Sequence, residues 1–129
     1  MTTAPTIAII DDDETIRTGL HFLVTSLGYN AYTFGSAADF LQSEQRHNAS
    51  CVISDVRMPS MSGVQLQAHL RSTGYKVPFI FITAVPEESV RQQAFNDGAI
   101  GFLNKPLDEE TLIACLDKAI GGAQPPADT

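Results

Sequence analysis

Five polar side chains that are far apart in the sequence each stand at the end of an apolar run. Asp11 and Asp12 follow TIAII, Asp55 follows CVIS, Thr83 closes PFIFIT, and Lys105 follows IGFLN. Clustered carboxylates supply the hard oxygen ligands that Mg²⁺ takes, together with waters and a phosphate oxygen. A carboxylate can also attack phosphorus and form an acyl phosphate, while an ammonium and a hydroxyl stabilise charge on the transferred group. These residue types therefore indicate metal-assisted phosphoryl transfer to Asp55.

The four consecutive acidic residues from Asp11 to Glu14 need an explanation, because neighbouring carboxylates repel and raise one another's pKa. Acidic residues after a strand can serve only as caps on the next helix. A bound divalent cation is the alternative, since it removes the repulsion between its carboxylate ligands. The other polar residues at the same predicted edge favour the cation.

The elements that position these side chains are short apolar runs alternating with helical patterns, which favours an α/β fold built of βα repeats. The first, third and fourth runs are apolar throughout, as central strands of a parallel sheet should be. Parallel strands joined by right-handed crossovers end at one edge of the sheet, where ligands bind. The predicted strands are residues 6–10, 30–34, 51–54, 78–83 and 100–104.

A helical pattern follows each predicted strand. The clearest is an amphipathic stripe over residues 16–27 that Gly28 ends. Capping residues, prolines and glycines bound the others. The expected helices are 36–45 after a Ser36–Asp39 capping pair, 63 to before Gly74, Pro86 to Gly98 with Glu87 and Glu88 in the first turn, and a last helix from the N-cap Asp108 to Gly121 and Gly122.

Composition limits the possible functions. A chain of 129 residues fits one domain, which can bury roughly two-thirds of its unfolded surface. A net charge of -7 with eight scattered Lys and Arg residues argues against direct nucleic-acid binding, which requires clustered cations. No apolar run is long enough to span a membrane, and MTTAPT at the N-terminus lacks a signal-peptide pattern. A cytoplasmic protein without membrane contact is expected.

The cysteines and histidines do not form clusters. Cys51 and Cys115 stand in apolar contexts without partners at metal-ligand spacing, so both are expected to be buried free thiols. His21, His47 and His69 fall on predicted helices and are expected at the surface rather than as phosphorylation sites.

Four segments in this order resemble the receiver domain of two-component response regulators over about residues 5–122. They are the acidic pair in IIDDDE, SDVRMPSMSG around Asp55, Thr83-Ala84 and FLNKP. RMP, the SG at 62–63 and FxxKP are most similar to receivers of nitrogen-fixation and nitrate-response regulators, which usually carry a helix-turn-helix output domain. The resemblance implies a flavodoxin-like, doubly wound five-stranded parallel sheet in the order 2-1-3-4-5. Residues 123–129 would be a tail or linker.

The resemblance implies a metal site at the acidic pair. Asp12 and Asp11 would be the metal carboxylates, Asp11 through a water, with Asp55 and the Arg57 carbonyl as further ligands. The expected cofactor is Mg²⁺, for which Mn²⁺ can substitute. The next two acidic residues would begin the first helix, where negative charge suits the helix dipole.

The resemblance also assigns the residues that bind and read the phosphoryl group. Asp55 would be the phosphoacceptor, and Thr83 and Lys105 would bind the phosphoryl oxygens. Phe102 takes the aromatic switch position, where some relatives have a tyrosine hydroxyl that phenylalanine lacks. Lys105-Pro106 is expected to be a cis peptide, and the residues that flank the site, Arg57 and Val85, are expected to tune the lifetime of the phosphoryl group.

The implied function is a phosphorylation-activated switch whose only chemistry is on itself. The donor would be a sensor histidine kinase or a phosphotransfer protein. Phosphorylation would alter the face made of the fourth helix, fifth strand and fifth helix, and would drive homodimerisation or an output such as transcription.

The same architecture also supports two other functions. A Mg²⁺-dependent phosphatase usually has a second Asp two residues after its nucleophile, where this chain has Arg57. A flavodoxin-type cofactor carrier needs a Ser, Thr and Gly-rich phosphate loop after the first strand, and DDDE would repel that phosphate. Both are disfavoured.

Overall fold

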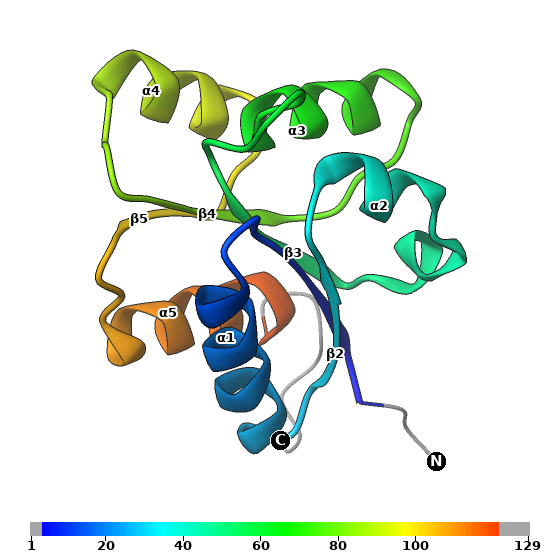
Figure 1. Cartoon of the computed structure of the whole chain (residues 1–129), viewed down its shortest axis with the longest axis vertical. Coiled ribbons are helices and arrows are strands. Elements are labelled where there is room, and N and C mark those ends of the chain that lie inside the picture. The colour runs from blue at the N-terminus through cyan, green and yellow to red at the C-terminus, as the bar shows by residue number, and fades with distance from the viewer. Residues whose placement is uncertain (1–3, 122–129) are drawn as a thin grey trace.

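A five-stranded parallel sheet with helices on both faces forms the fold (Figure 1). The computed structural model describes residues 4–121. The strand order is β2-β1-β3-β4-β5, which confirms the predicted flavodoxin-like topology. The elements are β1 (Thr6–Ile10), α1 (Glu14–Ser26), β2 (Asn30–Phe34), α2 (Ala37–Gln42), a 3₁₀ helix (Glu44–Asn48), β3 (Cys51–Asp55), α3 (Gly63–Ser72), β4 (Phe79–Thr83), α4 (Glu88–Asn96), β5 (Gly101–Asn104), α5 (Glu109–Leu116) and a π-helical turn (Asp117–Gly121).

The strand register brings the carboxyl ends of the inner strands level. Ile10 of β1 pairs with Ser54 of β3, Asp55 pairs with Ile82 of β4, and Thr83 pairs with Asn104 of β5. Every residue of β3 and β4 is buried. These strands carry the apolar runs predicted to be central, because both of their faces are covered.

Alternating side chains divide the interior into two cores. On β1, Ile7 and Ile9 point to one core, and Ala8 and Ile10 to the other. Helices α1 and α5 cover the first face, and α2, α3 and α4 cover the second (Figure 1). The strands therefore stay fixed between two packed layers while the loops at their ends carry polar residues.

Two predicted helix boundaries were wrong, for local reasons. Helix α2 ends at Gln42 rather than near Gln45, because Ser43 is extended and its hydroxyl accepts a hydrogen bond from Gln45 N–H, at the start of the 3₁₀ turn. Helix α4 begins at Glu88 rather than Pro86. Glu87 has extended backbone angles as the N-cap, and its carboxylate pairs with Arg57 instead of capping the helix.

The other boundaries agree closely with the sequence. Asp108 caps α5 as predicted, and Ser36 caps α2 by accepting from Asp39 N–H. Helix α5 ends at Leu116 and continues as the π-helical turn, while Gly122 and the predicted tail 123–129 lie outside the described residues. Strand β3 is one residue longer than predicted, and β4 and β5 each start one residue later. Gly28, Gly74 and Gly98, which end helices, have the positive φ angles that glycine allows.

The predicted free thiols and surface histidines are located by the same fold. Both cysteines are free, but only Cys51 is buried, while Cys115 on α5 is half-buried. All three histidines are exposed, as predicted. No helix within residues 4–121 is long and apolar enough to cross a membrane.

Candidate functional site

Three carboxylates converge at the carboxyl edge of the sheet. Asp11 and Asp12 directly follow β1, and Asp55 is the last residue of β3. One oxygen from each lies within 4.8 Å of an oxygen of the other two. Asp11 is fully buried and Asp55 is 6% exposed, whereas Asp12 is exposed. The site is therefore a buried pair of carboxylates with a third at its mouth.

Lys105 supplies positive charge to this cluster. Its Nζ lies 3.3 Å from Asp11 Oδ2 and 3.4 Å from Asp55 Oδ2. The backbone N–H of Lys105 donates to the carbonyl of Thr83 at 2.8 Å, which ties the loop after β5 to the end of β4. The Lys105-Pro106 peptide is cis, as predicted. The ammonium thus points back over the sheet edge toward both buried carboxylates.

The fold perturbs the charged groups of the site. Burial raises the pKa of Asp55 above its ordinary value of 3.8, and repulsion from Asp11 raises it further, against the lowering effects of Lys105 and the Arg57 backbone N–H. Burial alone would lower the pKa of Lys105, but attraction to Asp11 and Asp55 raises it above 10.5. The ammonium therefore stays protonated, while the carboxylates remain short of compensating charge.

The donor set fits a hard divalent cation. Asp11 Oδ1 accepts a hydrogen bond from Asp13 N–H, but the buried Oδ2 has no hydrogen-bond partner. Lys105 is within ion-pair distance of this oxygen without meeting hydrogen-bond geometry. A buried carboxylate oxygen without a hydrogen bond is costly. Mg²⁺ binds one or two carboxylates plus waters, so this cluster matches its preferences.

Thr83 and Phe102 lie on adjacent strands behind the carboxylates. Thr83 is fully buried, and its hydroxyl accepts from Val85 N–H at 3.1 Å and contacts the Val85 carbonyl at 3.2 Å. The hydroxyl is therefore engaged by its own loop and makes no hydrogen bond to the carboxylates. Phe102 of β5 is half-buried, pairs with Phe81 in the register, and has its ring centroid 6.3 Å from that ring.

The loops around the carboxylates are joined by an ion pair. Arg57 Nη2 lies 2.7 Å from Glu87 Oε1, which links the loop after β3 to the start of α4. Both side chains are about half exposed. Val85 is 52% exposed on the neighbouring loop. The two flanking residues predicted from the sequence therefore both lie at the mouth of the site.

Three features of the site were not assigned a role from the sequence. Gly63 begins α3 so close to β3 that a Cβ would lie 2.3 Å from the Asp55 carbonyl oxygen. Ser62 and Gln65 form a reciprocal capping box that fixes this helix start. Arg17 Nη1 donates to the Asp11 carbonyl at 2.7 Å. The Ser-Gly pair at 62–63 is a sequence signal for the close approach at Gly63. Nothing in the sequence around Arg17 indicates that its side chain returns to the end of β1.

The comparison with protein families agrees with this geometry. The model of the response regulator receiver domain matches residues 7–117, which include all the predicted site residues. The chain belongs to the response regulator receiver family. Receiver domains of this family are phosphorylation-activated signalling switches that take phosphoryl groups from histidine kinases, and they bind Mg²⁺ at an acidic pocket.

Two of the relatives that this chain matches are named as transcriptional regulatory proteins. The transcriptional regulatory protein FixJ of Bradyrhizobium diazoefficiens is 35% identical over 127 residues, covering 98% of this receiver and 62% of FixJ. The transcriptional regulatory protein TdiR of Thauera aromatica is 37% identical over 117 residues, covering 91% of this receiver and 52% of TdiR. The receiver thus spans 52% to 62% of the length of these relatives. The match to FixJ confirms the predicted similarity to nitrogen-fixation receivers.

Solved structures of receivers share the fold. The crystal structure of FixJ-N superposes with a TM-score of 0.83 at 30% identity and covers 96% of this receiver and 99% of that chain. The low-resolution structure of the response regulator StyR has a TM-score of 0.82 at 35% identity, covering 92% of this receiver and 60% of StyR. The disfavoured phosphatase and flavin-carrier readings gain no support from these matches.

Proposed function

We propose that this receiver accepts a phosphoryl group on Asp55 and uses it to switch the face formed by α4, β5 and α5. The observation that carries the proposal is the position of Asp55 at the end of β3, between two further carboxylates and the Lys105 ammonium. An Asp in this position is suited to attack phosphorus, because the Lys105 ammonium, together with a cation held by the carboxylates, would compensate the charge on the incoming group.

The residues that would hold a metal are Asp11, Asp12, Asp55 and the Arg57 carbonyl, with Mg²⁺ as the expected ion and Mn²⁺ as a substitute. The ion would supply charge neutralisation for the transferred phosphoryl oxygens and for the carboxylates. Asp11 would contribute through a bridging water, and the exposed Asp12 directly. The raised pKa of Asp55 in the absence of a cation supports this assignment, since that carboxylate gains from added positive charge.

The transfer step forms one bond and breaks one. A carboxylate oxygen of Asp55 forms a bond to phosphorus, and the bond from phosphorus to the donor nitrogen or oxygen breaks, with its electron pair leaving on the donor. Lys105 holds the phosphoryl oxygens through its ammonium, which remains protonated because its pKa is raised. Little other protein chemistry is needed, because phosphoryl transfer depends mainly on positioning and charge.

The switch would begin at Thr83. A phosphoryl group on Asp55 offers a charged acceptor, and charge-assisted hydrogen bonds are roughly twice as strong as the neutral bonds that Thr83 makes to Val85. Turning the hydroxyl toward the phosphoryl group would vacate space beside β5 for the half-buried Phe102 ring. The resulting movement would reshape the surface of α4, β5 and α5. A phosphoryl group biases such a change only through its differential interaction with the two states.

The partners follow from the family. The donor is proposed to be a sensor histidine kinase or a phosphotransfer protein, and phosphorylation is proposed to promote homodimerisation or regulation of transcription through a further domain. The receiver itself is not proposed to bind nucleic acid, to contact a membrane or to turn over an external substrate. A cytoplasmic location remains a prediction.

Acetyl phosphate with Mg²⁺ tests the proposed chemistry without the natural donor. Intact mass spectrometry should show one phosphoryl group on the wild type, none on Asp55→Asn, and none when EDTA removes the metal. Amide hydrogen exchange with beryllofluoride then tests the switch. Altered exchange over residues 84–104 is expected in the wild type but not in Thr83→Ala, and unaltered exchange in the wild type would leave only a phosphoryl carrier.

A further inference from the structure

Asp11 is held in place by three hydrogen bonds. Its backbone N–H donates to the Phe34 carbonyl at 3.1 Å, its Oδ1 accepts from Asp13 N–H at 2.9 Å, and its carbonyl accepts from Arg17 Nη1 at 2.7 Å. The remaining polar atom is the buried Oδ2, which lies near Lys105 without a hydrogen bond. These three bonds hold the residue while its Oδ2 faces Lys105 at ion-pair distance.

Of the three hydrogen bonds that hold Asp11, only the one from Arg17 is made by the side chain of another residue. It lies on α1 and is half-buried, and its guanidinium reaches the turn between β2 and α2. A Cβ on Gly35 in that turn would lie 3.4 Å from Arg17 Nη1 and 3.8 Å from Asp39 Oδ2. Within residues 4–121 Arg17 forms no ion pair. Its bond to the Asp11 carbonyl is thus its principal polar interaction there.

We infer that Arg17 is a positioning residue for the metal site, acting through the Asp11 backbone rather than on the metal or the phosphoryl group. The inference rests on the proposed metal-dependent function. Residues that orient a metal ligand through a hydrogen bond typically change metal affinity by about 10- to 100-fold when they are removed. Without Arg17 the fully buried Asp11 would lose the hydrogen bond to its carbonyl, which is one of the three that hold it, and its carboxylate would be held less firmly.

The sign of the effect separates positioning from simple charge. A guanidinium bound to the Asp11 backbone adds positive charge beside the metal site and repels a divalent cation, so Coulomb energy alone predicts that its removal tightens metal binding. Positioning predicts that its removal weakens metal binding. Arg17→Gln removes the charge and cannot span the same distance, whereas Arg17→Lys keeps the charge and a donor.

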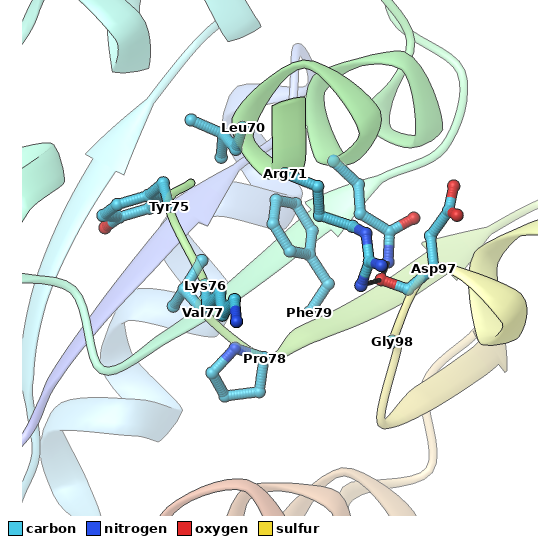
Figure 2. Close-up of a pocket in the computed structure, with 10 residues that line it drawn as sticks. Leu70, Arg71, Tyr75, Lys76, Val77, Pro78, Phe79, Asp97 and Gly98 are labelled. Carbon is cyan, nitrogen blue, oxygen red and sulfur yellow. Dashed lines mark hydrogen bonds between the residues drawn. The ribbon is translucent and has the colours of Figure 1, made fainter. Parts of the chain in front are cut away.

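Arg71 provides a control at the opposite end of the strands, where β4 begins. Its Nη1 donates to the Asp97 carbonyl at 2.7 Å, the same length as the bond from Arg17 to Asp11 (Figure 2). Figure 2 shows this pair beside Pro78 and Phe79, where β4 begins, while the carboxylates lie where the strands end. Arg71→Gln therefore removes an arginine-to-carbonyl bond of the same length, although a more exposed one, without touching the metal site.

The experiment measures the Mn²⁺ dissociation constant of the full chain by electron paramagnetic resonance of free Mn²⁺, alongside urea unfolding of each metal-free protein. We expect Arg17→Gln to bind Mn²⁺ about tenfold more weakly than the wild type. This value is at the lower end of the usual range, because removing the positive charge favours Mn²⁺ binding and partly offsets the affinity lost with the hydrogen bond. Arg17→Lys should recover part of the affinity. Arg71→Gln should keep the wild-type affinity even if its unfolding midpoint falls equally.

If the wild type binds Mn²⁺ and Arg17→Gln binds it as tightly as the wild type or more tightly, the inference is overturned while the proposed metal site stands. Equal weakening in Arg71→Gln would also overturn it, because the effect would then reflect general stability. If Arg17→Gln does not fold, Arg17→Met, which also removes the charge and the donor, takes its place, and Mn²⁺ binding by Arg17→Met as tight as that of the wild type overturns the inference. Absence of Mn²⁺ binding by the wild type would overturn both the inference and the proposed metal site.

Discussion

Gly63 is predicted to tolerate no side chain, because it begins α3 in direct contact with the end of β3. A Cβ there would lie 2.3 Å from the Asp55 carbonyl oxygen, 2.8 Å from Ser54 Oγ and 3.0 Å from a ring carbon of Phe81. Ordinary contacts begin at 3.4 Å, so Gly63→Ala must move the helix start or the strand end by about 1 Å. Neither backbone can give way without disturbing Asp55.

The cost follows from these contacts. Overpacking of a close interface costs about 1–3 kcal/mol. The shift also disturbs the hydrogen bonds from Ser54 Oγ to the Asp55 carbonyl and from Gly63 N–H to the Val56 carbonyl, which adds about 1 kcal/mol. Gly63→Ala should therefore lower the free energy of unfolding by about 2–4 kcal/mol and the melting temperature by roughly 10 °C.

Gly19→Ala is the matched control. Gly19 lies within α1, and a Cβ there would meet nothing within 4 Å. Alanine is the better helix former, so this variant should gain about 0.5–1 kcal/mol. Urea unfolding of the metal-free proteins measures both changes. A loss below about 1 kcal/mol in Gly63→Ala would show that α3 adjusts freely and that the close approach does not constrain Asp55.

Three further predictions concern the charged site and its switch. Because the pKa of Asp55 is raised, the folded chain retains a proton above pH 3.8 that the unfolded chain has lost, so metal-free stability should fall as pH rises through this window. Asp55→Asn should abolish this fall and raise the neutral-pH unfolding midpoint, and a midpoint below that of the wild type would contradict the raised pKa. At ten times its dissociation constant, Mg²⁺ should stabilise the wild type by about 1.4 kcal/mol in thermal melting. Asp12→Asn should lose this gain, and an equal gain in that variant would place the metal elsewhere. Thr83→Ala should remain a substrate for acetyl phosphate but lose beryllofluoride-induced dimerisation in sedimentation velocity, and dimerisation equal to the wild type would exclude Thr83 from the switch.

The sequence predicted the elements with continuous patterns. Strands β1, β3 and β4 followed from uninterrupted apolar runs, and the helix that Gly28 ends followed from one apolar stripe. The parallel arrangement then placed residues 44 positions apart, such as Asp11 and Asp55, at one edge. Local patterns thus sufficed wherever burial alone determines the element.

The features that the sequence did not predict depend on which partner an individual polar side chain takes. Helix α4 begins at Glu88, and the carboxylate of its N-cap residue Glu87 pairs with Arg57, thirty residues earlier, rather than with the helix. The hydroxyl of Thr83 is turned to its own loop, which no spacing rule indicates. Arg17 lies on a helix whose apolar stripe is clear, but periodicity does not show which polar side chain returns to the strand end.

Identification of the residue that carries the phosphoryl group tests the central claim most directly. Borohydride reduces an aspartyl phosphate to homoserine, and peptide mapping by mass spectrometry locates that change in the chain treated with acetyl phosphate and Mg²⁺. Homoserine is expected at position 55 alone, with no conversion when EDTA is present. Conversion at Asp11 or Asp12, or undiminished labelling of the Asp55→Asn variant, would contradict the assignment of Asp55 as the acceptor.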